Sequence, residues 1–99
     1  MIKAEQIRKI TNKVNQERQK IALSFIKSEW ETFIEPRIED AAKDGRCSIA
    51  YFWSKEIFQE HGISIYDAAQ AIRLLGSTEL GFNIGVIDLT VNLEVEISW

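Results

Sequence analysis

The sequence predicts an α+β domain in which a long N-terminal helix precedes a β-α-β-β unit with a small, mainly antiparallel sheet. Residues 2–44 contain no Gly and a single proline, Pro36, so nearly half of the 99 residues can be helical. Residues 91–99 alternate apolar and polar side chains, as a strand with one buried face does. Two further short segments, 47–53 and 82–87, are rich in β-favouring residues, and helical patterns separate these strands.

The N-terminal half of the long helix is patterned for contact with another helix. Its apolar residues recur at spacings of 3, 4, 7 and 4, close to the heptad spacing of coiled coils; they are Ile7, Ile10, Val14, Ile21 and Phe25. Beyond Ile21 the apolar face broadens, as expected where a helix packs on a core. We therefore expect a single domain in which residues 1–27 form a projecting helical arm and residues 28–99 form the core.

The length of this helix is itself informative. A helix of about 40 residues spans roughly 60 Å, which is more than the diameter of a small domain. Part of it must therefore project into solvent or meet another chain. Pro36 removes one backbone donor and crowds the preceding turn, so we expect a kink near residues 32–35; the alternative is a new helix with Pro36 at its first position.

Glycines and capping residues set the other boundaries. Gly45 is expected to end the long helix in the left-handed conformation. Ser54 can cap a short helix over 55–60. Ser64, with Asp67 three residues later, resembles a capping box and begins a helix over 65–75 that Gly76 is expected to end.

Composition excludes several classes of protein. The chain is 45% hydrophobic and 27% charged, with a net charge of −3, which is typical of a soluble globular domain and gives no global attraction to nucleic acid. The absence of a long apolar run or a signal peptide predicts no membrane association and a cytoplasmic location. One Cys and one His exclude an internal disulfide and a two-histidine metal motif.

No catalytic, cofactor-binding or metal-binding residue is predicted, and we do not expect an enzyme. Cys47 and His61 could form a nucleophile and base, but no third group is indicated to orient the imidazole. A buried structural thiol and a surface histidine are the expected roles. Gly76, Gly81 and Gly85 lack the following Gly-Lys-Ser/Thr of a phosphate-binding loop.

Charge is segregated along the long helix. Residues 1–27 hold seven basic and two acidic residues, whereas 28–44 hold two basic and six acidic ones. Side-by-side antiparallel pairing of two copies would set opposite charges together, which predicts an antiparallel homo-oligomer. Glu31, Glu35 and Glu39 form a ridge of like charge that favours a cationic partner, although a solvated face is the simpler alternative.

The expected interface combines the apolar stripe, the acidic ridge and two tryptophans, which often dominate binding energy: Ile7, Ile10, Val14, Ile21, Phe25, Trp30, Glu31, Glu35 and Trp53. A second candidate surface, for anions, consists of Lys9, Lys13, Arg18 and Lys20. It lacks interleaved aromatic residues and has acidic neighbours, which argues against nucleic acid.

Two stretches resemble small uncharacterised proteins of phages and prophages. In these proteins a long N-terminal helix ends in an Ala-Ala-x-x-Gly turn and the last strand ends in Ile-Ser-Trp, matched here by Ala41, Ala42, Gly45 and residues 97–99. Gly81 and Phe82 belong to the same resemblance. It implies a phage-type accessory protein in the host cytoplasm, acting in virion structure, in regulation or on a host defence factor.

The expected function is thus that of a non-enzymatic, oligomeric, protein-binding accessory protein without a cofactor. One alternative is a small-molecule or nucleotide binder whose pocket between subunits combines aromatic residues with Arg37, Arg46 or Arg73. The other is nucleic-acid binding by the basic N-terminal helix, with a steep dependence on salt.

Overall fold

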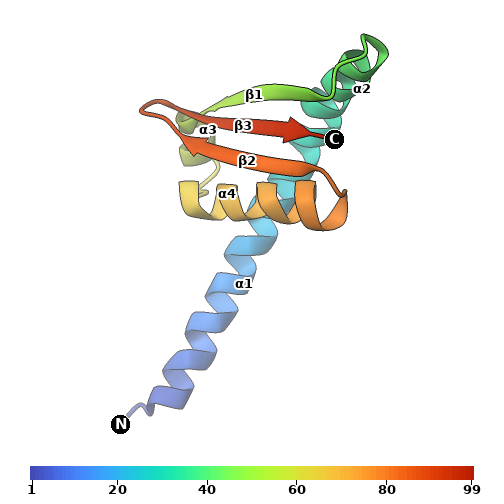
Figure 1. Cartoon of the computed structure of the whole chain (residues 1–99). Helices are drawn as coiled ribbons and strands as arrows, with labels where there is room; N and C mark the ends of the chain where they lie inside the picture. Colours follow the sequence, from blue (N-terminus) through green and yellow to red (C-terminus); the bar gives the residue numbers. More distant parts are fainter.

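A computed structural model describes all 99 residues and confirms the α+β fold class. Two of its helices continue into π-helical turns, which contain one more residue than an α-helical turn. The elements in order are α1 (Ala4–Glu29), a π turn (Trp30–Ile34), α2 (Glu35–Lys43), β1 (Ser48–Ser54), α3 (Lys55–Glu60), α4 (Ile65–Arg73), a second π turn (Leu74–Glu79), β2 (Asn83–Asp88) and β3 (Asn92–Ser98) (Figure 1).

The chain remains helical from Ala4 to Lys43, through Pro36. The distortion expected near residues 32–35 is the π turn Trp30–Ile34, in which the Glu35 N–H donates to the carbonyl of Trp30. Proline has no N–H for the helical ladder, and its ring would crowd the carbonyl four residues earlier. The wider turn directly before Pro36 relieves that conflict without ending the helix.

This helix is longer than the rest of the molecule can cover. The molecule measures 63 × 27 × 20 Å along its principal axes, and its long dimension is close to the length of a 40-residue helix. Every residue from Met1 to Ile21 is exposed, and Ala22 is the first buried one. We call residues 1–21 the exposed arm. It is shorter than the expected 1–27, because Ala22 and Ile26 belong to the core.

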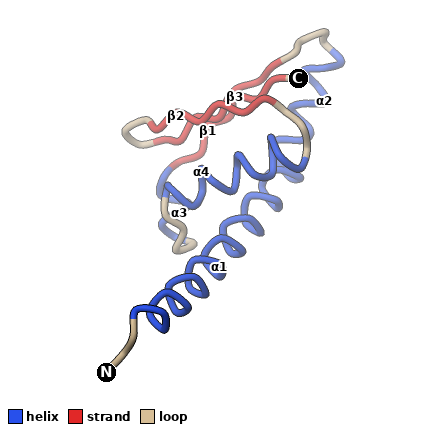
Figure 2. The backbone as a smooth tube through the Cα atoms, turned by 60° about the horizontal axis from the view of Figure 1, so that its bottom comes forward, coloured by secondary structure: helices blue, strands red, loops and turns tan.

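The sheet has the strand order β1-β3-β2, with both neighbouring pairs antiparallel. The helices lie on one of its faces (Figure 2). The apolar residues of the central strand, Leu93, Val95 and Ile97, are fully buried against them. Glu94 and Glu96 alternate with these residues and therefore point to the open face. The alternation predicted for residues 91–99 is confirmed for Leu93, Val95 and Ile97, and it fixes the register of the sheet, whereas Val91 and Trp99 lie outside β3 and are 68% and 40% exposed.

The core lies between this face of the sheet and the helices that cover it. From the long helix it takes Ala22, Ile26, Trp30 and Ile34, and from α4 it takes Ala68, Ala71 and Ile72. Phe58 of α3 is fully buried, and its ring centroid lies 5.9 Å from those of both Phe25 and Trp53. An aromatic cluster therefore closes one end of the core.

The local signals at helix ends are largely confirmed. Gly45 has φ +79°, and the N–H groups of Arg46 and Gly45 donate to Ala41 and Ala42 at 2.9 and 3.0 Å, which is a Schellman motif. Ser64 Oγ accepts a hydrogen bond from the Asp67 N–H at 3.1 Å. Ser54 precedes α3, but its hydroxyl makes no capping bond.

The role expected for Gly76 is wrong. The helix does not end there but continues in the π turn Leu74–Glu79, and the chain turns at Gly81 with φ +79°. Gly76 instead marks a close approach. A Cβ atom on it would lie 2.6 Å from Ile84 Cδ1 and 3.2 Å from Trp30 Cη2.

We therefore predict that Gly76→Ala lowers the free energy of unfolding by about 1–3 kcal/mol, because the added methyl group forces Ile84 and Trp30 apart. Denaturant unfolding would measure the loss. Gly85→Ala is the matched control, since its added Cβ would meet nothing closer than 3.8 Å. Equal stability of the two variants would contradict the close-approach role of Gly76.

Candidate functional surfaces

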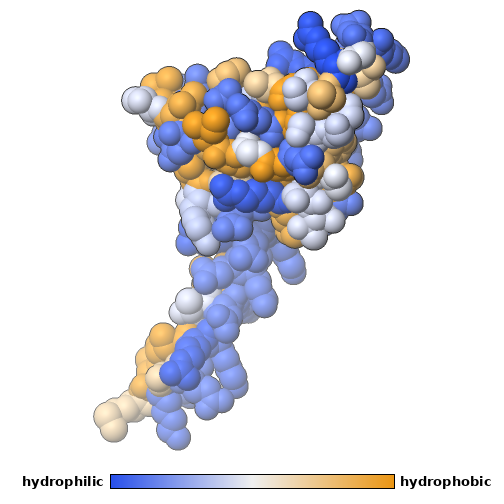
Figure 3. Space-filling view, viewed as in Figure 1, coloured by the Kyte–Doolittle hydropathy of each residue, from blue (hydrophilic) through white to orange (hydrophobic).

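The exposed arm presents an apolar stripe that nothing in the chain covers. Ile7, Ile10, Val14 and Ile21 are 47%, 60%, 47% and 56% exposed. Figure 3 shows apolar residues gathered at the free end of the arm beside hydrophilic ones. An uncovered stripe at nearly heptad spacing is typical of a helix that packs against another helix.

The cations of the arm are free with one exception. Arg18 Nη2 lies 3.0 Å from Asp67 Oδ2, and the Asp67 side chain is only 13% exposed. Arg18 thus ties the arm to the start of α4, while its own side chain remains 54% exposed. Lys9, Lys13 and Lys20 are exposed and form no ion pair.

Three aromatic residues expected at an interface lie inside the body. Trp30 and Trp53 are each 3% exposed and belong to the core. Phe25 is partly buried and packs between Phe58 and His61. The indole N–H of Trp53 has no acceptor, so this residue contributes packing rather than a hydrogen bond. Trp30 and Trp53 therefore expose almost no area at the surface of this fold.

The two nucleophile-and-base candidates are separate surface groups. Cys47 is exposed, which corrects the expectation of a buried thiol. His61 Nδ1 donates to the carbonyl of Ile57 at 2.8 Å, and its ring lies 4.5 Å from that of Phe25. No three His, Cys, Asp or Glu side chains are arranged to hold a metal ion.

A groove of about 570 Å³ runs between the long helix and the π turn that follows α4. We call it the acidic groove. Its apolar lining consists of Trp30, Ile38, Leu75, Leu80 and Phe82, and its charged lining consists of Lys27, Glu31, Glu35, Glu39 and Glu79. The sequence pattern indicates the ridge of Glu31, Glu35 and Glu39, but Glu79 and the apolar floor join it only through the fold.

Most of the acidic side chains of this groove form no ion pair within the chain. Lys27 Nζ lies 3.8 Å from Glu79 Oε2, which pairs the one base of the groove. Glu31, Glu35 and Glu39 form no ion pair within the chain. An apolar floor beside three uncompensated carboxylates suits a ligand that is both apolar and basic.

No protein-family model, curated protein or solved structure matches this chain. None of its helices combines the length and the apolar character that crossing a bilayer requires. Function must therefore follow from the surfaces of the molecule itself.

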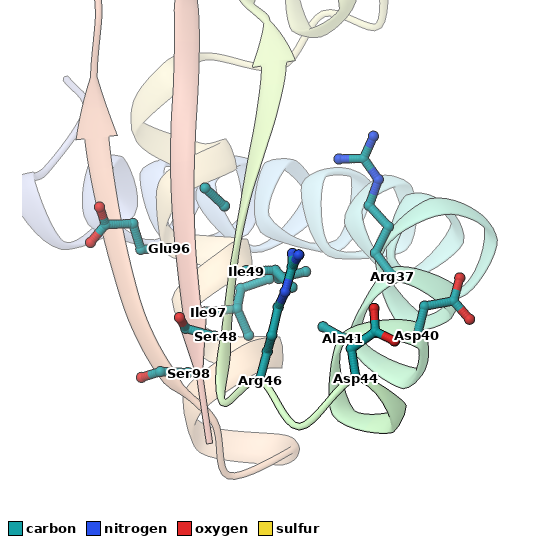
Figure 4. Close-up of a pocket in the computed structure, with 11 residues that line it drawn as sticks. Arg37, Asp40, Ala41, Asp44, Arg46, Ser48, Ile49, Glu96, Ile97 and Ser98 are labelled. Atoms are coloured by element: carbon teal, nitrogen blue, oxygen red, sulfur yellow. The ribbon is translucent and has the colours of Figure 1, made fainter.

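A second groove, of about 650 Å³, lies between α2 and β1. In Figure 4, Arg46 stands between the strand and the helix that carries Arg37, with the Asp40 and Asp44 carboxylates close by. Two arginines face three acids here, since Glu96 also lines the groove, so the balance of charge does not favour an anion. Arg73 lines a different pocket, so the three arginines do not converge.

Tyr51 lies beside this second groove, with the Arg37 guanidinium 5.2 Å from its ring centroid. Burial raises the pKa of Tyr51 above 10.0, and the Glu29 carboxylate raises it further, while Arg37 opposes the shift. The folded state therefore holds the phenolic proton at a pH where the unfolded state has lost it.

We predict that stability falls as the pH rises above about 10 and through the folded-state pKa of Tyr51, because the unfolded chain releases this proton first. Tyr51→Phe should show a shallower alkaline loss in denaturant unfolding between about pH 9 and 11.5. Tyr66→Phe, which removes a phenol on a side chain that is 70% exposed, is the matched control. Identical pH profiles for the wild type and Tyr51→Phe would contradict the assignment.

Proposed function

We propose that this chain is a non-enzymatic, protein-binding accessory protein of the phage type that assembles with a second copy of itself. One observation carries the proposal: residues 4–21 form a helix whose apolar stripe has no cover within the chain. Its place of action would be the cytoplasm, that of the host if a phage encodes it.

Helix energetics support a partner for the exposed arm. An isolated helix of about 18 residues is marginal in water, because most helical stability in proteins comes from packing of one face. Burial of a single Ile side chain contributes about 1.5–3 kcal/mol relative to exposure. Ile7, Ile10 and Val14 together could therefore offset much of the cost of holding the arm in one conformation.

The charges of the chain favour a second copy over an unrelated partner. The exposed arm carries six basic and two acidic residues, whereas residues 28–44 carry six acidic and two basic ones. Each copy therefore offers both halves of a complementary pair, and a two-fold dimer forms both contacts at once. Nucleic acid is the weaker candidate, because the arm has no aromatic side chain and is followed by an acidic segment.

The remaining parts of the proposal have separate support. The phage-type context rests on the resemblance that includes Ala41, Ala42 and Gly45, the residues of the Schellman motif. Because those residues end a helix, the resemblance concerns fold and context rather than chemistry. The separate surroundings of Cys47 and His61 support a role without catalysis.

Light scattering at high micromolar concentration tests the assembly. We predict a mass above the 11.4 kDa of one chain for the wild type and the monomer mass for the double variant Ile10→Ser with Val14→Ser, which interrupts the stripe. Asn12→Ser with Gln16→Ser, on the opposite side of the arm, should leave the mass unchanged. A monomeric wild type at that concentration would refute the proposed function.

A further inference from the structure

We infer that the acidic groove is the docking site for the exposed arm of a second copy. This inference rests on the proposed function and identifies the surface that carries it out. The groove and the arm belong to different parts of the molecule and are described by independent observations, namely a hollow in the body and an uncovered stripe on the arm.

The lining of the groove suits an amphipathic helix. The long helix and the π turn Leu74–Glu79 both contribute to it, and its apolar lining includes Trp30, Leu75 and Phe82. A helix bound in such a groove inserts apolar side chains spaced three, four and seven residues apart. Ile7, Ile10 and Val14 have this spacing and are about half exposed.

The charges of the two surfaces are complementary. Three carboxylates of the groove lack an intrachain cation, and the arm carries five cations without an intrachain acid: Lys3, Arg8, Lys9, Lys13 and Lys20. The charge of neither surface is balanced by ion pairs within its own chain. Contact between the two surfaces would bring their opposite charges together.

A specific register follows from the spacing of four residues that both rows share. The row on the arm reads Glu5, Lys9, Lys13, Glu17, and the row on the groove reads Lys27, Glu31, Glu35, Glu39. Antiparallel alignment with Lys13 beside Glu31 also places Lys9 beside Glu35 and Glu17 beside Lys27. Three of the four levels then pair opposite charges, and Glu5 beside Glu39 is the exception.

Symmetry selects the antiparallel orientation. The charge rows alone would also permit parallel alignment, but a two-fold axis along parallel helices sets each arm against the other arm and not against a groove. A parallel arm in a groove would be displaced along the helix and would build an open filament. Only antiparallel exchange lets the two copies of a closed dimer each give one arm and receive one. In the register above, the axis passes at the level of Ala22, where the exposed arm ends.

The dimensions permit this exchange. The 18 helical residues from Ala4 to Ile21 extend about 27 Å, whereas the row from Lys27 to Glu39 covers about 18 Å. The arm can therefore cover the whole row while its body remains outside the groove.

Complementary charge reversal tests the docking site. Glu31→Lys with Glu35→Lys, or Lys9→Glu with Lys13→Glu, should each raise the dimer dissociation constant at least tenfold, because like charges then meet at two levels. All four side chains are exposed, so folding should persist, and circular dichroism would verify this. Glu56→Lys with Glu60→Lys, two exposed acids on α3, is the matched control and should retain the dimer.

Mixing gives the decisive measurement. An equimolar mixture of the groove variant and the arm variant should recover the dimer in sedimentation velocity, because each arm then meets a groove of opposite charge. Failure of the mixture to associate would overturn the docking site.

The control outcomes separate the two proposals. Dimerisation that survives groove reversal but is lost in Ile10→Ser with Val14→Ser would overturn the docking site and leave the proposed function standing. A monomeric wild type would overturn both.

Discussion

The structure depends on one constraint, which is that the body of the protein covers only about half the length of the helix from Ala4 to Lys43. The sheet and α4 cover it only from Ala22 onward. Ordering the backbone costs about 1–2 kcal/mol per residue, and the first 21 residues offset that cost with no buried side chain of their own. That imbalance leaves the apolar stripe of the exposed arm without cover inside the chain.

The covered part of the helix contributes both to the core and to the acidic groove. Trp30 belongs to the core and also forms part of the floor of the acidic groove, and its ring lies 3.2 Å from the position of a Cβ atom on Gly76. The Phe82 ring, in the same groove, has its centroid 5.8 Å from that of Trp30. The groove is therefore lined by side chains already fixed by core packing. A floor that is ordered before binding loses little conformational entropy when a ligand arrives.

Local patterns in the sequence predicted the elements well. The alternation within residues 92–98, the capping pair Ser64 and Asp67, and the left-handed Gly45 each depend on neighbours within a few positions, and each is found in the structure. The stripe of the exposed arm is likewise a local pattern, and its exposure follows from the length of the helix.

The misplaced residues depend on contacts distant in sequence. Trp30 and Trp53 suit an interface and a core equally well by residue type, and only the packing of α4 against the sheet decides between them. The pairing of Arg18 with Asp67 and the meeting of Glu79 with the ridge of Glu31 and Glu35 join segments about 50 residues apart. No periodicity within one element could indicate them. The role of Gly76 was mispredicted for a related reason. Its lack of a side chain makes room for Ile84 and Trp30, which are distant in sequence, and does not mark the end of a helix.

The π turn at Trp30–Ile34 makes the fold sensitive to the insertion or deletion of a single residue. A π turn holds one residue more than an α turn, and removing that residue would rotate everything beyond it by about 100° around the helix axis. Ala41 would then leave the body, and the helix would present a different face to β1. The number of residues in the turn before Pro36 is therefore itself a structural requirement.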